Sequence, residues 1–140
     1  VSSNGEKFIT LFVGKFNYKT QELQYINAGH NQPMMYLKNK KELSFLSKGC
    51  VGIGMIDEIP LIRKGSVTIE EPAKIICYTD GLVELIDGKK VSFGTKELED
   101  CIMNNNLIED NIQAIIRKQG IFEGSPAIFD DISILGIEFY

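Results

Sequence analysis

The hydrophobic pattern of this chain changes its period once, at Thr79, and that change limits the folds open to it. Before Thr79 the apolar residues alternate within short runs, which is typical of half-buried strands. After Thr79 they recur at helical spacing, until one last apolar run closes the sequence. Many strands, then two helices and a final strand indicate an α+β fold with antiparallel sheet. At 140 residues the chain suffices for one domain with a core.

Six strands are expected before the change of period. They cover residues 8–17, 23–29, 34–39, 42–47, 61–69 and 73–79. Short polar turns join the first four into two hairpins, and the six together predict an antiparallel meander. The segment 48–60 contains three glycines and is expected to be a loop.

Two helices and one strand are expected after Thr79. Thr95 is the expected N-cap of the first helix, because acidic residues follow it in the first turn. The second helix covers residues 107–120, since its isoleucines recur on one face and Gly120 follows its basic end. The closing strand is expected over residues 129–140.

Composition argues against several classes of function. Three cysteines without C-x-x-C spacing, and a single histidine, do not make a zinc site, so buried reduced thiols are expected. The lysine clusters lack interleaved aromatic residues, which argues against nucleic-acid binding. No apolar run approaches the length of a membrane span. These features favour a cytoplasmic protein.

Carboxylates follow one expected strand and precede another. Asp80 and Gly81 come directly after the most hydrophobic strand, and Asp130 and Asp131 come directly before the last one. If these two strands are antiparallel neighbours, the carboxylates converge at one edge of a sheet. Clustered carboxylates suit Mg²⁺ or Mn²⁺, which activates water for hydrolysis of phosphate esters. The alternative from spacing alone is that both motifs are ordinary turns or solvated caps.

Five motifs, taken in order, resemble one family. They are INAGHNQPMMY (26–36), IGM (53–55), CYTDGLVEL (77–85), FG (93–94) and FDDISILGI (129–137). Together they resemble the bacterial stage II sporulation protein E family of metal-dependent serine/threonine phosphatases, related to the protein phosphatase 2C superfamily. The resemblance implies a sandwich of antiparallel sheets flanked by helices. It also implies a two-metal centre and hydrolysis of phosphoserine or phosphothreonine by metal-bound water. The implied partners are a phosphorylated anti-anti-sigma-type regulator and an upstream sensor domain, and an N-terminal sensor of this kind can tether a parent protein to a membrane.

The resemblance assigns roles to individual residues. Asp80 and Asp130 match the family's catalytic metal ligands, and Asp131 is a further acidic member of the metal site that supports them. Gly81 lets the chain pass close to the site. Glu84 is expected to be a surface or hydrogen-bonding residue.

The sequence also departs from the family pattern. Two early motifs of the family, a glycine-rich aspartate motif and an aspartate-x-x-glycine-histidine-glycine motif, do not occur in it. We therefore expect residues 1–140 to be the C-terminal portion of a single phosphatase domain, incomplete at its N-terminus and inactive alone. An uncovered sheet is expected to favour self-association, for instance as a homodimer. The alternatives are a non-catalytic regulatory or scaffold domain, and a β-rich structural module.

The only histidine, His30, lies in the first motif. Its expected role is that of a turn residue, with its imidazole and the amides of Asn27 and Asn31 fixing the loop by hydrogen bonds. The alternative is a direct role of His30 near the phosphate, and in either case His30 and Asn31 are expected to support the site. Gln32 stands where the family commonly has proline.

Overall fold

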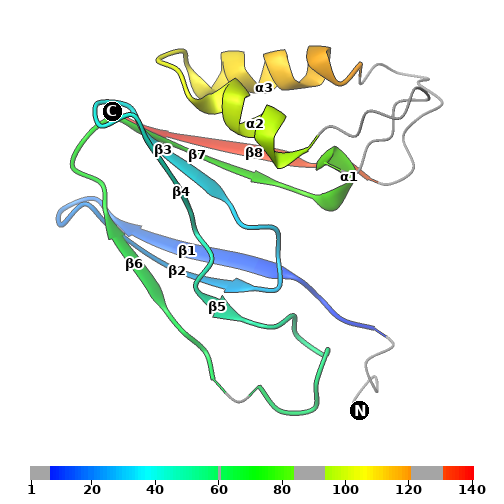
Figure 1. The fold of residues 1–140 in the computed structure, drawn as a ribbon. Coiled ribbons are helices and arrows are strands. Elements are labelled where there is room, and N and C mark those ends of the chain that lie inside the picture. The colour runs from blue at the N-terminus through cyan, green and yellow to red at the C-terminus, as the bar shows by residue number, and fades with distance from the viewer. Residues whose placement is uncertain (1–6, 60, 84–93, 121–130) are drawn as a thin grey trace. The chain divides into compact units, whose positions relative to one another are not determined.

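The computed structural model describes residues 7–59, 61–83, 94–120 and 131–140 (Figure 1). The strands are β1 (Leu11–Asn17), β2 (Glu22–Ala28), β3 (Met34–Leu37), β4 (Glu42–Phe45), β5 (Gly49–Cys50), β6 (Gly65–Thr68), β7 (Ala73–Tyr78) and β8 (Ile134–Phe139). The helices are α1 (Asp80–Val83), α2 (Thr95–Ile102) and α3 (Ile108–Lys118). Two mainly antiparallel sheets and a few helices confirm the predicted α+β class.

The chain divides into two compact units, and each is interrupted in sequence. The first contains residues 1–32 and 45–70, and the second contains residues 33–44 and 71–140. In the first unit β1 and β2 form the predicted hairpin, with Leu11 opposite Ala28 and Asn17 opposite Glu22. On its other side β2 pairs with β6 in antiparallel and with β5 in parallel orientation.

The prediction of one antiparallel meander is wrong, because the strands form two sheets and one pairing, that of β2 with β5, is parallel. The segment expected to be a loop contains β5, which places Gly49 opposite Asn27 of β2. A β-carbon on Gly49 would lie 1.7 Å from the carbonyl oxygen of Asn27, so only glycine permits this approach. The periodicity of apolar residues cannot predict β5, because its pairing with β2 depends on glycine having no side chain at position 49.

The second unit is a four-stranded sheet in the order β4-β3-β7-β8, with α2 and α3 over one of its faces (Figure 1). Its central strand β7 is antiparallel to both β3 and β8. The core lies between this face and the helices. Its fully or nearly fully buried members are Met34, Tyr36, Ile76, Tyr78, Leu82, Leu98, Ile102 and Ile115. The isoleucine stripe of α3 therefore packs as predicted, since Ile108 and Ile112 also contact this core.

One charged side chain, Lys74 of β7, is fully buried in the second unit. Its Nζ donates to the carbonyl and side-chain oxygens of Asn104, at 2.9 and 3.2 Å, and to the Asn106 carbonyl at 3.3 Å. It also donates to Oδ1 of Asn111 at 2.6 Å and lies 5.5 Å from the ring centre of Tyr36. Lys74 thus ties the α2–α3 connection to the middle of the sheet.

Several predicted boundaries need correction. Gly94, not Thr95, is the N-cap of α2, and its N–H donates to Oε2 of Glu97 at 2.9 Å. The strand expected over 61–69 shortens to β6, and the closing strand begins only at Ile134. The three cysteines are free thiols and are half-buried, not fully buried. Within the described ranges, no helix has the length and hydropathy required to cross a membrane.

Candidate functional site

The end of β7 and the beginning of β8 meet at one edge of the second sheet. The two strands are antiparallel, with Tyr78 opposite Ile134, so the neighbour relation predicted from the sequence is confirmed. Asp80 follows the end of β7, and Asp131 precedes the beginning of β8. The topology therefore brings these two predicted site residues to the same edge.

Thr79 joins the two chain segments at this edge. Its backbone N–H donates to the carbonyl oxygen of Ser133 at 3.1 Å, which extends the ladder one residue beyond the strands. Its hydroxyl donates to the carbonyl oxygen of Asp131 at 3.0 Å and accepts from the N–H of Ser133 at 2.9 Å. The backbone of Asp131 is thereby bound to the residue next to Asp80.

A single helical turn holds Asp80 at the surface. Asp80 is exposed, whereas Gly81 and Leu82 behind it are buried. The N–H of Leu82 donates to the carbonyl oxygen of Thr79 at 3.0 Å, and the carbonyl of Leu82 accepts from Nε2 of Gln119 at 3.1 Å. A helix was not predicted here, and the structure shows the short helix α1 anchored to the end of α3.

The surroundings of this edge carry negative charge. Burial raises the pKa of the Tyr78 phenol, and the carboxylates of Asp80 and Glu99 raise it further. The carboxylates of Asp80 and Glu99 therefore both contribute negative potential at the Tyr78 phenol. Such a potential favours a cation, and oxygen ligands are those that Mg²⁺ and Mn²⁺ prefer.

The structure does not bring all predicted site residues together. Asp80, Gly81 and Asp131 share the β7–β8 edge, whereas Asp130 and Glu84 lie outside the described residues. No group of three or more acidic, histidine or cysteine side chains able to hold a metal occurs among the residues that the structure describes. The roles of the predicted ligands stay predictions.

His30 lies in the first unit, where Asn27 fixes its loop. The buried Asn27 accepts from the backbone N–H of His30 at 2.8 Å through Oδ1, and its Nδ2 donates to the carbonyl of Leu46 at 3.3 Å. The imidazole of His30 is 3.4 Å from the hydroxyl of Thr10. Nδ2 of Asn31 is buried and has no hydrogen-bond partner among the described residues.

Replacing His30 with alanine is expected to reduce stability more than metal affinity. Among the described residues the imidazole makes one long polar contact, to the Thr10 hydroxyl, so we expect the free energy of unfolding to fall by about 0.5–1 kcal/mol. Asn27→Ala removes two hydrogen bonds of a buried side chain and is expected to cost about 2 kcal/mol. Urea unfolding and titration with Mn²⁺ measure the two properties. Weaker Mn²⁺ binding by His30→Ala at unchanged stability would instead place His30 in the site.

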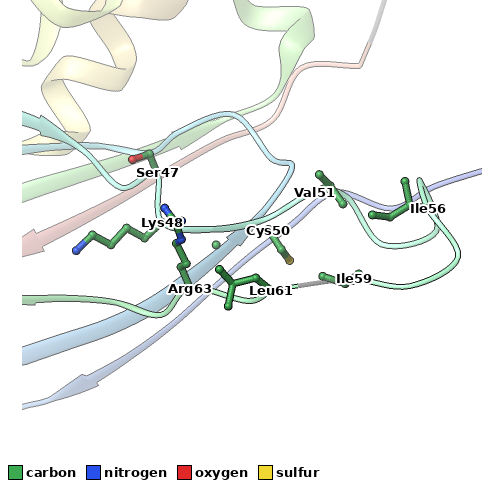
Figure 2. A pocket seen from close by; sticks show the side chains of 9 residues that line it. Ser47, Lys48, Cys50, Val51, Ile56, Ile59, Leu61 and Arg63 are labelled. Carbon is green, nitrogen blue, oxygen red and sulfur yellow. The ribbon is translucent and has the colours of Figure 1, made fainter.

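A cavity of about 480 Å³ in the first unit was not predicted from the sequence (Figure 2). A hydrogen bond joins two of the segments that line it, since the backbone N–H of Arg63 donates to the carbonyl oxygen of Gly49 at 3.0 Å. Apolar side chains line most of it, and Lys48 and Arg63 are its charged members. The described residues of the lining include no carboxylate or imidazole, so they do not fit Mg²⁺ or Mn²⁺.

Comparison with known families and proteins gives consistent matches. The model of the family "Stage II sporulation protein E (SpoIIE)" matches residues 2–140. Protein IcfG of Synechocystis sp. strain PCC 6803 is 30% identical over 132 residues, which cover 93% of this chain and 20% of IcfG.

Solved structures share the fold. The SiaA-PP2C domain of Pseudomonas aeruginosa superposes with a TM-score of 0.67 at 21% identity, over 87% of this chain and 48% of that one. The phosphatase domain of the cell fate determinant SpoIIE from Bacillus subtilis, from a crystal presoaked with manganese, gives a TM-score of 0.60 at 16% identity. That match covers 91% of this chain and 55% of the other. The present chain thus spans a fifth of IcfG and about half of each of these domains.

Proposed function

Because the chain belongs to the stage II sporulation protein E family, we propose that it forms part of a metal-dependent protein serine/threonine phosphatase domain. The observation that carries the proposal is the meeting of β7 and β8, which places Asp80 and Asp131 at one edge of the sheet. The PP2C fold of the solved relatives supports it. We further propose that residues 1–140 are the C-terminal portion of that domain.

Asp80 and Asp130 are the proposed catalytic metal ligands, with Asp131 in support and with Gly81 beside them. The donor set fits Mg²⁺ or Mn²⁺, because these ions prefer carboxylate oxygens and keep several waters. Such an ion, when bound, supplies Lewis-acid activation of water and of a phosphoryl group. The chain's own contribution is to hold Asp80 at the exposed end of the buried strand β7, with Asp131 before the neighbouring strand β8. His30 and Asn31 are proposed to support the site only through the conformation of their loop.

The proposed substrate is a phosphorylated anti-anti-sigma-type regulator. It would carry phosphoserine or phosphothreonine, and a sensor domain upstream of the phosphatase would control its hydrolysis. This proposal rests on the family, which also favours a cytoplasmic location for the domain. Nucleic acid is not among the proposed partners.

Asp80→Asn tests the metal site. The substitution removes one charge without changing the side-chain size, and we expect the dissociation constant for Mn²⁺ to rise at least about tenfold. Asp110→Asn is the matched control, because Asp110 is also an exposed aspartate in the first turn of a helix. Calorimetric titration of the purified chain measures both. Equal binding by wild type and Asp80→Asn would remove Asp80 from the site.

A non-catalytic regulatory or scaffold domain is the second candidate. It is favoured by the sequence of residues 1–140, which does not contain the two early metal-binding motifs of the family. We propose accordingly that the 140-residue chain alone turns over little substrate. Release of phosphate from a phosphoserine protein by the full-length parent protein distinguishes the candidates, since a scaffold would bind that protein and release none.

A further inference from the structure

Thr79 has a hydroxyl that no motif assignment uses, although it lies between the two acidic segments. The hydroxyl contributes two of the three hydrogen bonds that join Thr79 to residues 131–133. It donates to Asp131 and accepts from Ser133, which a hydroxyl can do and a methyl group cannot. The Thr79 side chain therefore holds the two segments together beyond the last residue pair of the β7–β8 ladder.

We propose that Thr79 is the positioning residue of the metal site, because its hydroxyl fixes the backbone of Asp131 beside Asp80 and so sets the spacing of the two carboxylates. The inference rests on the proposed function and deepens it. Thr79 itself is not a ligand in this proposal, since both of its hydroxyl contacts are to backbone groups.

The physical reason is preorganisation. β8 begins only at Ile134, so Asp131 and Ser133 precede the regular ladder. Residues outside a ladder are held less firmly, and a cation that binds them must order them first. Groups that orient metal ligands without touching the metal typically change metal affinity about 10–100-fold when they are removed. The same range is expected for loss of the Thr79 hydroxyl.

Two variants separate the hydroxyl from the shape of the side chain. Thr79→Val keeps the shape but lacks the hydroxyl, and Thr79→Ser keeps the hydroxyl. We expect the dissociation constant for Mn²⁺ to rise at least about tenfold in Thr79→Val and to stay near the wild-type value in Thr79→Ser. Thr68→Val is the matched control, because Thr68 lies in β6 and its hydroxyl has no partner among the described residues. Thr79→Ala replaces Thr79→Val if the latter fails to fold by circular dichroism.

A second readout requires no metal. Hydrogen exchange of the Ser133 amide is expected to be faster by up to about tenfold in Thr79→Val and unchanged in Thr79→Ser, because this amide donates to the hydroxyl. Faster exchange together with weaker Mn²⁺ binding supports the proposal.

The outcomes distinguish this inference from the proposed function. If Mn²⁺ binding depends on Asp80 but is the same in wild type and Thr79→Val, the positioning role is overturned and the metal site stands. If wild type and Asp80→Asn bind Mn²⁺ equally, the proposed metal site is overturned and the positioning role with it. Unchanged exchange at Ser133 in Thr79→Val also overturns the positioning role.

Discussion

Lys74→Met is expected to lower the free energy of unfolding by about 3–5 kcal/mol, because it leaves buried oxygen atoms without a donor. The side chain of Lys74 is fully buried and donates to four oxygens of Asn104, Asn106 and Asn111. Methionine has a similar length and fills the same space, so packing changes little. What is lost is the link between β7 and the α2–α3 connection.

Lys40→Met is the control for this substitution. Lys40 is largely exposed, and its ion pair with Glu71 has an N–O distance of 3.7 Å. Exposed pairs contribute at most about 1 kcal/mol. Urea unfolding followed by circular dichroism measures both variants. Equal losses of stability in the two would show that Lys74 does not hold the connection.

The same variant gives an expected pH dependence. Burial lowers the pKa of Lys74 from 10.5 to about 8, the nearby Lys38 lowers it as well, and Glu138 raises it. Between these two pH values the unfolded chain binds a proton that the folded chain lacks, so the contribution of Lys74 to stability rises with pH. The difference in unfolding free energy between wild type and Lys74→Met is therefore expected to grow from pH 7 to pH 10. Comparing the two proteins cancels the opposite effect of Cys77, whose pKa burial raises to about 11.

Gly49→Ala is expected to lower the free energy of unfolding by about 3 kcal/mol, at the upper end of the range for overpacking. The new β-carbon would lie 1.7 Å from the carbonyl oxygen and 2.5 Å from the carbonyl carbon of Asn27. Both atoms are backbone, so no rotation of a side chain relieves the clash. β5 must move away from β2. The hydrogen bonds from the N–H groups of Asn27 and Gly29 to Lys48 and Cys50 would then be lost.

Gly14→Ala is the matched control in β1 of the same sheet. Its β-carbon would lie 3.3 Å from a terminal carbon of the Leu23 side chain, which can adjust. Alanine also loses less conformational entropy than glycine when it folds into a strand. We therefore expect the free energy of unfolding of Gly14→Ala to lie within about 1 kcal/mol of the wild-type value. Hydrogen exchange of the Asn27 and Gly29 amides locates the effect. If Gly49→Ala is as stable as Gly14→Ala, β5 is not held by this close approach.

The sequence predicts those parts of the fold in which one segment determines its own structure. The β1–β2 hairpin follows from alternation around residues 18–21, and α3 follows from its isoleucine spacing and its charged ends. β5 could not be predicted, because its pairing depends on the lack of a side chain at Gly49 and on a partner strand elsewhere. The burial of Lys74 could not be predicted either, because lysine side chains are normally exposed to solvent. Its hydrogen-bond acceptors also lie thirty or more residues later in the sequence.

The candidate site likewise has some features that the sequence predicts and others that it does not. The positions of Asp80 and Asp131 follow from strand ends, and antiparallel pairing of β7 with β8 then places them at one edge. The role of Thr79 could not be foreseen, because it depends on where β8 begins. A threonine directly before the aspartate was the only available signal. For His30, the sequence indicated a loop fixed by side-chain hydrogen bonds, and the structure shows this for Asn27, which binds the His30 N–H and the Leu46 carbonyl. The expected backbone hydrogen bonds of the His30 imidazole and the Asn31 amide are not seen among the described residues, because the imidazole lies against the Thr10 hydroxyl and Nδ2 of Asn31 has no partner there.

The interleaving of the two units has a consequence for how the chain acquires its structure. The chain passes from one unit to the other after Gln32, after Ser44 and after Glu70. Truncation after residue 70 would leave β3 and β4 without β7, while a fragment beginning at residue 71 would lack two of the four strands of its sheet. Neither unit can therefore be isolated as a contiguous piece. Pairs such as Lys38 with Glu138 must close a loop of about one hundred residues, so we expect slow, concerted folding in which both units form together.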